Sequence, residues 1–561
     1  MNKSIYTVKI AGPAGAGIKN AGKLLSTLLT RHGYSVFDYS EYPSLVRGGH
    51  NTYQVSFSSR KIYTAYSTVD IFISLKPGHW RPHLQEFHTQ TLIFSDETPH
   101  LKKHRVLSLP FAKIIQELDS DIYTNTVSLG LLSFLLRLDI KITQSLLKKS
   151  FPQKIEANLK AFRLGYEYGQ SRFAKYQLQL NHHIQNLAAA SLYDGNEALG
   201  WGFLAGQGNF YAAYPMTPST GLLHFLAEKQ KQFNLVVRHP EDEIAAANMA
   251  SGAAFAGSRA AVGTSGGGFA LMTESVSFSA MAEIGMVYYL IQRPAPATGM
   301  PTWTSQSDLL FSVFSGHGDF LKIVLAPGTH LESFDFSWQA LNLADILQTP
   351  IIVLTDKFLA ESSTNLNDLS KIRVSIDRGK IITSKISTGF KRYSLKSTSG
   401  ISSRSLPGIK DGMFLANSYE HDETGFATED GKTAALMAGK RLKKIKTAFT
   451  LTPLPILHGP KNFTTLILSW GSTTAPILET LQFLKQKHTS FLQIRTLWPL
   501  HPKIKTYLSK AKKIIVIENN QTSQLTTLLK SQFFFQPNHT ILKFDGRPFF
   551  PEELYEKIKK L

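Results

Sequence analysis

The sequence of 561 residues contains no cysteine. Without thiols the chain can form no disulfide, hold no cysteine-ligated iron–sulfur cluster and use no thiol nucleophile. If its chemistry passes electrons through such a cluster, another polypeptide must carry that cluster. The sequence also has no run of about 18 uncharged apolar residues, and its first residues resemble a strand and not a signal peptide. We therefore expect a cytoplasmic protein that does not associate with a membrane.

Signatures of metal-dependent and nucleotide-dependent catalysis are also missing. The chain has no HExxH, GxxxxGK[ST], GxSxG or DxDxDG pattern, and none of its 18 histidines has a partner at metal-ligand spacing. His239, His317 and His421 stand near other polar residues, where a hydrogen-bonded structural or loop role is the simpler interpretation. We predict no metal site on this chain.

The net charge of +20 raises the question of nucleic-acid binding. The lysines and arginines are scattered, with local concentrations at residues 102–105, 440–444 and 510–513. None of these is interleaved with aromatic residues, and no helix-turn-helix or zinc-finger spacing is present. We interpret them as solvated surface and expect no nucleic-acid partner, although a positive field would help to attract an acidic substrate or protein.

Apolar strand runs alternate with amphipathic helices along most of the chain, which indicates an α/β protein. A length of 561 residues exceeds what one core supports, so we expect several domains. The pattern divides into an α/β block at residues 1–185, a second at 190–360, a Ser-, Lys- and Gly-rich linker or arm at 361–455, and a third α/β block at 456–561.

The first block opens with a strand, a glycine turn at residues 12–17 and a helix, and the next strand ends at Asp38. This order is close to the dinucleotide-binding fingerprint, but the glycine spacing is GxxGxG and not GxGxxG. Gly15 and Gly17 would direct backbone N–H groups at a phosphate or carboxylate. Alternatively, the glycines only permit a tight turn and close packing of the helix on the sheet.

Arg47 and His50 flank two glycines on a loop that leads into a later strand. A cationic side chain and a hydrogen-bonding side chain on such a loop form a plausible clamp for an anion. A glycine hairpin with exposed charges explains the same residues almost as well.

The most informative stretch lies in the second block, where residues 214–220 read YPMTPST. Two prolines stiffen this loop, and Thr217 is among the hydroxyl side chains that could hydrogen-bond a small anion. Glu243 then opens a helix of small residues, which suits close packing against a second domain or subunit. A carboxylate in that position is partly desolvated and could hold or relay a proton.

Apolar strands are predicted at residues 260–264, 286–292 and 350–356 of the same block. The first runs into a glycine turn, TSGGG, and the second ends at Arg293, whose fork of donors suits a carboxylate. Open parallel sheets bind their ligands at the carboxyl ends of the strands. The residues alone thus predict an acidic relay and an anion site at an interface.

Several motifs in a fixed order resemble one known family. The stretches YPMTPST, HPEDEIAAANMASGAAFAG, TSGGG, QRPAPATGMPT with QSD at 306–308, and SGHGDF at 315–320 are similar to the alpha subunit of 2-oxoacid:ferredoxin oxidoreductases, with the 2-oxoglutarate enzymes as the nearest type. HDETG, LSWGST, RTLWPL and ENNQTSQL resemble the rest of that subunit. GPAGAGIKNAG and EYPSLVRGGHNTYQV resemble the family's gamma subunit, here fused ahead of alpha.

The resemblance implies a thiamine diphosphate enzyme that decarboxylates a 2-oxo acid oxidatively to an acyl-CoA and reduces ferredoxin. It implies a gamma-type, CoA-side domain first, then a thiamine-diphosphate pyrimidine-type domain, and a transketolase-C-terminal-like domain last. Glu243 matches the glutamate that hydrogen-bonds N1′ of the cofactor's aminopyrimidine. Further matches are Thr217, Arg293 and Thr298 near the substrate carboxyl groups, and Gly15, Gly17, Arg47 and His50 as CoA contacts.

The resemblance also implies partners. The diphosphate-binding signature, GDG followed by asparagine, is absent, so the Mg²⁺–diphosphate half is expected on a beta subunit. Because cysteine is absent, the [4Fe-4S] cluster is expected on a partner as well, and the isolated chain should be inactive. We expect two alpha–beta pairs. The chain departs from the family at residues 294–297, which read PAPA within a loop that usually reads QRGGPSTG, and at its three glycines, where SGPG is common. The identity of the 2-oxo acid therefore stays open.

Other interpretations fit parts of the sequence. The substrate could be pyruvate or another 2-oxo acid instead of 2-oxoglutarate. A dinucleotide-dependent oxidoreductase would explain the glycine turn and Asp38, but it leaves the second and last blocks without a role. A non-catalytic binding or nucleic-acid protein is suggested by the charge alone.

Overall fold

Residues 4–44, 49–98, 101, 103–118, 120–180, 190–386, 389–484 and 488–561 are described by the computed structural model. The contacts divide the chain into two units. One unit holds Met1–Asp194, Ser362–Asp368 and Phe550–Ile558, and the other holds Gly195–Glu361, Leu369–Phe549 and Lys559–Leu561. Most of the second α/β block, of the arm and of the last α/β block therefore belongs to one unit. Within the described ranges, no helix has the length and apolar character needed to cross a bilayer.

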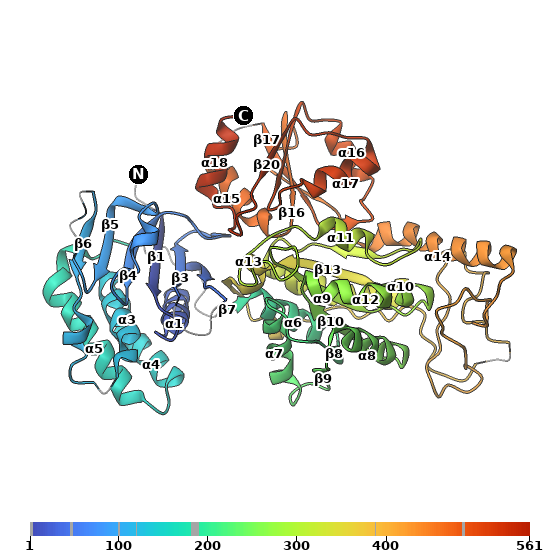
Figure 1. The fold of residues 1–561 in the computed structure, drawn as a ribbon, viewed down its shortest axis with the longest axis horizontal. Coiled ribbons are helices and arrows are strands. Elements are labelled where there is room, and N and C mark those ends of the chain that lie inside the picture. Colours follow the sequence, from blue (N-terminus) through green and yellow to red (C-terminus); the bar gives the residue numbers. More distant parts are fainter. Residues whose placement is uncertain are drawn as a thin grey trace. The chain divides into compact units, whose positions relative to one another are not determined.

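The first unit is built on an eight-stranded sheet of mixed direction, in the order β6-β5-β4-β1-β3-β2-β14-β7 (Figure 1). Helices from this unit pack their apolar faces on one side of the sheet, where Leu28, Val127 and Phe162 are almost completely buried. The strands are β1 (Ile5–Gly12), β2 (Ser35–Glu41), β3 (Asn51–Ser58), β4 (Val69–Ser74), β5 (Phe87–Ser95), β6 (Arg105–Ser108), β7 (Ser191–Asp194) and β14 (Ser363–Leu366). The helices are α1 (Ile18–Arg31), α2 (Phe111–Ile114), α3 (Thr124–Leu135), α4 (Ile140–Ser150), α5 (Ile155–Phe173) and most of α18 (Pro551–Lys559).

The strand order contradicts the dinucleotide-binding interpretation. β3 lies between β1 and β2 and runs antiparallel to both, whereas a dinucleotide-binding unit pairs its first two strands directly in parallel. Asp38 lies in the middle of β2, is buried, and accepts a 3.1 Å hydrogen bond from the Ser363 N–H. Burial raises the pKa of Asp38 to about 6. This acid is therefore part of the sheet and not a ribose ligand at a strand end.

The second unit contains a seven-stranded sheet in the order β18-β12-β13-β11-β10-β8-β9, in which only β18 is antiparallel to its neighbour. The predicted strands at 260–264, 286–292 and 350–356 are present, and all three are buried along their length, as is typical of parallel strands covered on both faces. The strands are β8 (Phe210–Ala212), β9 (Val236–Arg238), β10 (Ala260–Thr264), β11 (Val287–Gln292), β12 (Ile323–Leu325), β13 (Ile351–Asp356) and β18 (Thr496–Trp498).

Helices cover both faces of this sheet (Figure 1). The predicted small-residue helix is α8, and its alanines at 246, 247, 250 and 254 are buried within the chain itself. Asp242 caps α8 by accepting a 2.7 Å hydrogen bond from the Ala245 N–H. The helices are α6 (Gly195–Ala205), α7 (Thr220–Lys229), α8 (Glu243–Phe255), α9 (Gly266–Leu271), α10 (Thr273–Met281), α11 (Leu309–Phe314), α12 (His330–Leu347) and α13 (Lys357–Glu361).

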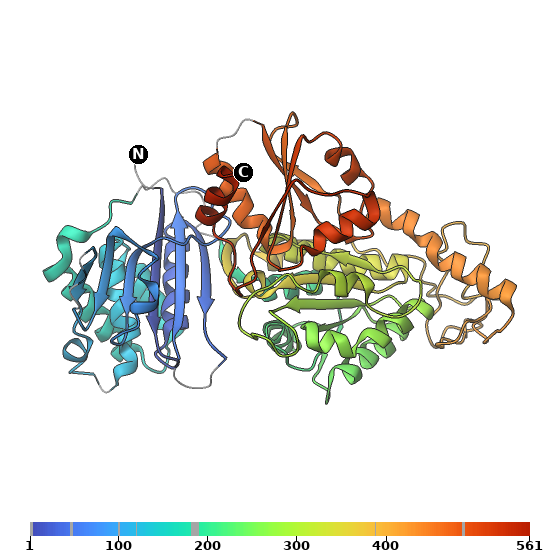
Figure 2. The same ribbon diagram turned by 45° about the horizontal axis from the view of Figure 1, so that its top comes forward.

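The last α/β block forms a five-stranded sheet in the order β15-β17-β16-β19-β20, with α15 on one face and α16 and α17 on the other (Figure 2). Its β18 continues the chain from β17 and joins the edge of the seven-stranded sheet, which ties the two sheets of this unit together. The elements are β15 (Ile456–His458), β16 (Thr465–Trp470), β17 (Thr489–Ile494), β19 (Lys513–Glu518), β20 (His539–Leu542), α15 (Thr474–Leu484), α16 (Lys503–Leu508) and α17 (Gln524–Phe533).

The arm is irregular in the part of residues 372–430 that is described, where isolated bridges replace strands. A long helix, α14 (Gly431–Leu451), follows it and was not predicted. Asp430 caps this helix by accepting a 2.8 Å hydrogen bond from the Thr433 N–H. The helix begins where the Ser- and Gly-rich composition ends.

The basic run at 440–444 is not the solvated surface that we predicted. Lys440 and Lys444 are buried, and their Nζ atoms lie 2.5 and 2.7 Å from the two carboxylate oxygens of Glu283. Arg392 of the arm donates a 2.8 Å hydrogen bond to the main-chain oxygen of Glu283. Burial alone would raise the pKa of Glu283, but the neighbouring ammonium groups of Lys444 and Lys440 outweigh it and hold that pKa far below its usual range. The cluster fixes α14 and the arm to the chain segment before β11.

Candidate active site

Polar side chains gather at the carboxyl edge of the seven-stranded sheet. Because β8, β10, β11 and β13 are parallel, the loops that follow them lie at the same edge. These loops carry the stretch at 214–220, the three glycines, Arg293 and the QSD motif, and α8 begins at this edge after β9. Parallel-sheet topology therefore brings the main sequence-predicted groups of the second block together.

Glu243 is the first residue of α8 and is only 4% exposed. Among the residues that the structure describes, its Oε1 atom is buried without a hydrogen-bond partner. A buried carboxylate oxygen without a partner is costly in a folded protein, and a ligand with a hydrogen-bond donor at this point would remove that cost. The sequence predicted that Glu243 would face a closely packed partner. The structure places it against this chain's own glycine segment.

The three glycines at 266–268 form the first turn of α9 and not the open turn that we predicted. A β-carbon on Gly268 would overlap Thr264 Oγ1 and lie 2.6 Å from Glu243 Oε1. A β-carbon on Gly266 would lie 2.5 Å from Asp308 Oδ2. Gly267 is exposed, and its nearest neighbour would be the sulfur of Met216 at 4.0 Å. Two of the glycines therefore allow two buried carboxyl groups to approach the same helical turn.

Arg293 and Thr217 meet at this edge. The Arg293 Nη1 donates a 2.7 Å hydrogen bond to the main-chain oxygen of Thr217, which holds the guanidinium beside the stiff loop at 214–220. Burial lowers the pKa of Arg293, and the carboxyl group of Asp308 opposes that effect. The arginine keeps donors beyond the one bound to Thr217, so it can still receive an anion.

Asp308, the last residue of the QSD motif, is a functional candidate to which the sequence gave no role. It is 7% exposed, and burial raises its pKa to about 6 while the positive charge of Arg293 lowers it. Its N–H donates a 2.8 Å hydrogen bond to Gln292 Oε1, and Gln292 donates in turn to the Thr355 oxygen at 3.1 Å. The motif that carries Asp308 was visible in the sequence, but its burial depends on contacts with β11 and α9.

Thr298 lies in the exposed stretch of the loop that follows Arg293. Ala297 and Gly299 of this loop have positive φ angles of 51° and 54°, and the Met300 N–H closes the loop on the Pro294 oxygen at 3.1 Å. The described contacts do not bring Thr298 to Glu243. Its predicted place near the substrate stays a prediction.

The QSD segment also joins the second and last α/β blocks. Gln306 is fully buried, donates from Nε2 to the Trp470 oxygen at 2.8 Å and accepts from the Asn519 N–H at 2.9 Å. Gln524 Nε2 donates to the Ser307 oxygen at 2.7 Å. The ENNQTSQL motif of the last block therefore holds the loop that carries Asp308.

A second group of predicted residues lies in the first unit. The pairing of Gly12 with Asn51 brings His50 to the end of β1, where Gly15 and Gly17 form the turn before α1. Both glycines have positive φ angles, and a β-carbon on Gly17 would overlap the side-chain amide of Asn125. Three of the four predicted CoA contacts thus share one sheet edge. Arg47 lies outside the described residues.

His50 is the centre of a hydrogen-bonded chain that the sequence did not reveal. Its Nδ1 lies 2.8 Å from His79 Nδ1, and its Nε2 lies 2.6 Å from His83 Nε2. His83 contacts Glu86 at 2.7 Å, and Glu86 pairs with Lys9 at 2.7 Å. Burial and the neighbouring histidines lower the pKa of His50 to about 4. His79 and His83 stand four residues apart, a spacing that we overlooked when we found no histidine pair at ligand spacing in the sequence. Their distance from His50 along the chain hid the cluster.

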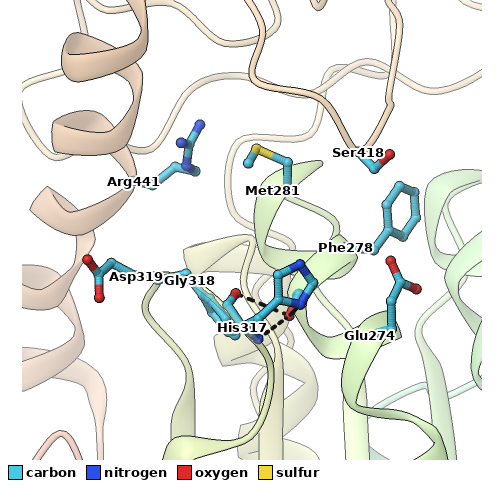
Figure 3. A pocket seen from close by; sticks show the side chains of 10 residues that line it. Glu274, Phe278, Met281, His317, Gly318, Asp319, Ser418 and Arg441 are labelled. Atoms are coloured by element: carbon cyan, nitrogen blue, oxygen red, sulfur yellow. Dashed lines mark hydrogen bonds between the residues drawn. The ribbon is translucent and has the colours of Figure 1, made fainter.

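A pocket of about 190 Å³ lies at the opposite edge of the seven-stranded sheet (Figure 3). Residues of α10, of the loop before β12, of the arm and of α14 line it, including Glu274, Phe278, His317, Asp319 and Arg441. His317 accepts from and donates to Ser277, as a loop histidine would. The described residues contain no group of three or more His, Asp or Glu side chains placed to hold a metal ion. We assign the pocket no catalytic role, because it lies at the amino ends of β11 and β12.

Comparisons with known proteins agree on one relationship. A family model described as "Pyruvate flavodoxin/ferredoxin oxidoreductase, thiamine diP-bdg" matches residues 202–438, and one described as "Pyruvate ferredoxin/flavodoxin oxidoreductase" matches residues 7–168. The chain is 30% identical to 2-oxoacid:ferredoxin oxidoreductase 2, subunit alpha, of Aeropyrum pernix, over 98% of this chain and 97% of that protein. It is 24% identical to the 2-oxoglutarate oxidoreductase subunit KorA of Mycobacterium tuberculosis, over 98% and 91%.

A solved structure has the same fold throughout. The 2-oxoglutarate:ferredoxin oxidoreductase from Magnetococcus marinus, solved with 2-oxoglutarate, coenzyme A and succinyl-CoA bound, is 27% identical and has a TM-score of 0.92. The match covers 100% of both chains. The α/β multidomain fold predicted from the sequence is confirmed.

Proposed function

The chain belongs to the 2-oxoacid:ferredoxin oxidoreductase family as an alpha-type subunit, and from this premise we propose that it builds the substrate side of the active site. The enzyme oxidises a 2-oxo acid in the presence of CoA, releases carbon dioxide, forms an acyl-CoA and passes a pair of electrons to ferredoxin. We propose 2-oxoglutarate as the substrate and succinyl-CoA as the product. The single observation that carries the active-site assignment is the buried Glu243 with an unpartnered Oε1 beside the glycine turn.

The residues at this edge fit thiamine diphosphate. The matched family model is described as thiamine diphosphate-binding, and it covers the loop, α8 and the glycine turn. Glu243 would hold or accept a proton at Oε1 toward a ring nitrogen of the aminopyrimidine, which satisfies the atom left without a partner. The absence of a side chain on Gly268 leaves room for the Glu243 carboxylate in this position. Thiamine diphosphate, when bound, supplies the nucleophilic carbon that adds to a 2-oxo group.

Arg293 and Thr217 are proposed to bind the substrate's carboxylate. The Arg293 guanidinium is already oriented by its hydrogen bond to the Thr217 oxygen, so less side-chain entropy is lost when the substrate binds. Thr298, on the exposed loop that follows Arg293, is proposed as a further contact of the substrate's carboxyl groups. The proposal for 2-oxoglutarate draws on the relatives named for it and on the solved relative that holds it.

Gly15, Gly17 and His50 are proposed as CoA contacts, together with Arg47. The N–H groups of the turn after β1 suit a phosphate, and His50 offers a ring that is neutral at physiological pH because its pKa is lowered to about 4. The unit that holds these residues corresponds to the model matched at residues 7–168.

The partner is proposed to be a beta subunit that carries the Mg²⁺–diphosphate site and the [4Fe-4S] cluster, in an assembly of two alpha–beta pairs. The relatives are named as alpha subunits, which implies at least one other subunit. Ile244 and Met249 on α8 are 48% and 44% exposed, and an apolar surface beside Glu243 suits a partner that completes the site.

Co-expression with the beta subunit tests this function. The purified complex should reduce ferredoxin or a viologen dye only when a 2-oxo acid and CoA are both present, and in a panel with pyruvate it should prefer 2-oxoglutarate. Arg293→Gln should raise the KM for the 2-oxo acid by tenfold or more, since a charged hydrogen bond contributes about 1.5–3 kcal/mol. Arg163→Gln, at an exposed position on α5 of the first unit, is the control and should leave KM unchanged. A complex that shows no 2-oxo-acid-dependent reduction would disprove the proposal.

A further inference from the structure

Asp308 has a buried carboxyl group, and one of its two oxygens has no hydrogen-bond partner among the described residues. Its main chain is fixed by the Gln292 side chain, and the oxygen without a described partner is Oδ2. A β-carbon added at Gly266 would lie 2.5 Å from that oxygen, so even an alanine side chain there would overlap it. The fold therefore fixes the position of Asp308 but leaves one of its carboxyl oxygens without a hydrogen bond from the described residues. Asp308 lies at the edge of the sheet where Glu243 and Arg293 also lie.

The charged groups that face Asp308 are few. Arg293 lies on the segment after β11, and its positive charge lowers the pKa of Asp308. Glu243 lies on the far side of the glycine turn, against Gly268. Gln292 of β11 accepts from the Asp308 N–H, and Gln524 of the last α/β block contacts the neighbouring Ser307; both are neutral amides. Asp356, a buried carboxyl group on β13, stands opposite Gln292 in the sheet. Arg293 is the charged group that acts most directly on the ionisation of Asp308.

An anion that reaches Arg293 changes this balance. It neutralises the cation that helps Asp308 to ionise, and it adds a negative charge near a carboxyl group that is already poorly solvated. Both effects favour the protonated form of Asp308. Protonation also removes the negative charge of Asp308 that repels the anion.

We propose that Asp308 is a specificity-determining residue that couples binding of the substrate carboxylate at Arg293 to the uptake of one proton. The proton comes from solvent and bonds to a carboxylate oxygen of Asp308, and no other bond forms or breaks in this step. Neutral Asp308 admits the anion, and ionised Asp308 repels it. This inference rests on the proposed function, because it takes the anion to be a 2-oxo acid.

The consequence is a binding affinity that depends on pH. In the free protein Asp308 is half protonated near pH 6. With an anion bound, the pKa of Asp308 is higher. At a pH between the pKa of the free protein and that of the anion-bound protein, binding of each anion is therefore accompanied by the uptake of up to one proton. Affinity then falls by as much as about tenfold for each pH unit across that interval and levels off above it. The carboxylates of a 2-oxo acid stay ionised throughout, so they contribute no such slope.

Calorimetry on the alpha–beta complex measures the coupling without turnover. Glutarate, which has no 2-oxo group to react, is titrated into the complex at pH about 6.5–7.5 in two buffers of different ionisation heat, and the difference gives the protons taken up. The wild-type complex should take up close to one proton. Asp308→Asn keeps the shape of the side chain and should take up none, with an affinity that no longer changes with pH. Asp319→Asn, an exposed acid at the opposite edge of the sheet, should behave as wild type.

Steady-state kinetics separates this inference from the proposed function. In Asp308→Asn the KM for 2-oxoglutarate should become independent of pH from about pH 6 to 8, while kcat keeps the wild-type pH profile. Wild-type activity with no proton uptake, or uptake that survives in Asp308→Asn, overturns the coupling alone. A wild-type complex that shows no 2-oxo-acid-dependent reduction overturns the proposed function and this inference together.

Discussion

Replacing Gly266, Gly267 and Gly268 by alanine, one at a time, would test the geometry of the candidate site without changing any charge. All three glycines lie in the first turn of α9, and none has a positive φ angle. Alanine is the better helix former by about 0.5–1 kcal/mol, so local propensity favours each substitution. Differences among the three variants must therefore come from what each new methyl group meets.

The structure gives a different expectation at each position. At Gly268 the methyl group would overlap Thr264 Oγ1 and lie 2.6 Å from Glu243 Oε1. Both residues are almost fully buried, so overpacking of about 1–3 kcal/mol is expected, along with a shift of the Glu243 carboxylate. At Gly266 the methyl group would press on Asp308 Oδ2 at 2.5 Å. At Gly267 it would meet only the Met216 sulfur at 4.0 Å, so this variant is the matched control.

Urea unfolding of the chain and turnover of the alpha–beta complex measure the two consequences. Gly268→Ala should lose stability and about a hundredfold in kcat, because a displacement of roughly 1 Å in a catalytic group has an effect of that size. Gly266→Ala should chiefly raise the KM for the 2-oxo acid. Gly267→Ala should be as active as wild type and equally or slightly more stable. If Gly268→Ala matched Gly267→Ala in stability and turnover, the placement of Glu243 against the glycine turn would be wrong.

Two further predictions concern buried charges. Glu283→Gln should lower the free energy of unfolding by about 3–5 kcal/mol, because it leaves Lys440 and Lys444 buried without their carboxylate. Lys391→Gln, which breaks only an exposed ion pair of the arm, should change the free energy of unfolding far less in the same urea titration. Asp308→Asn should stabilise the chain by about 3 kcal/mol at pH about 7.5, since folding raises the pKa of Asp308 from 3.8 to about 6 and the ionised form is therefore disfavoured in the fold. The gain should shrink as pH falls through about 6 and vanish near pH 4, where Asp308 is protonated in both states; a gain that is constant with pH would contradict the burial of an ionisable group at this position.

The parallel strands of the second unit could be predicted from the sequence because their signal is local. β10, β11 and β13 are short apolar runs bounded by polar residues, and burial on both faces produces that pattern. The family resemblance, which rests on motifs along the whole chain, is confirmed by the full-length relatives. The glycine turn was harder, because glycine disfavours helices and α9 forms only within its tertiary surroundings.

Pairings between distant residues could not be predicted. Lys440 is separated by 157 residues from Glu283, so a basic run that looked solvated is in fact buried beside its partner. The same holds for Asp308, which the sequence showed only as part of a motif, and for His50, whose contacts with His79 and His83 depend on how β3 and β4 flank β1. Asp38 was misread because strand order cannot be read from a single βαβ pattern. A third, antiparallel strand lies between the two expected neighbours.

The most direct test of the active-site assignment compares Glu243→Gln with Glu241→Gln in the alpha–beta complex. The two glutamates lie two residues apart, but Glu243 is buried and Glu241 is exposed, so only the first can serve a bound cofactor. Glutamine preserves the size of the side chain and removes its ability to hold and release a proton. Turnover of 2-oxo acid and CoA should fall by about a thousandfold or more in Glu243→Gln and stay at the wild-type level in Glu241→Gln. Wild-type turnover in Glu243→Gln would contradict the role assigned to this carboxylate.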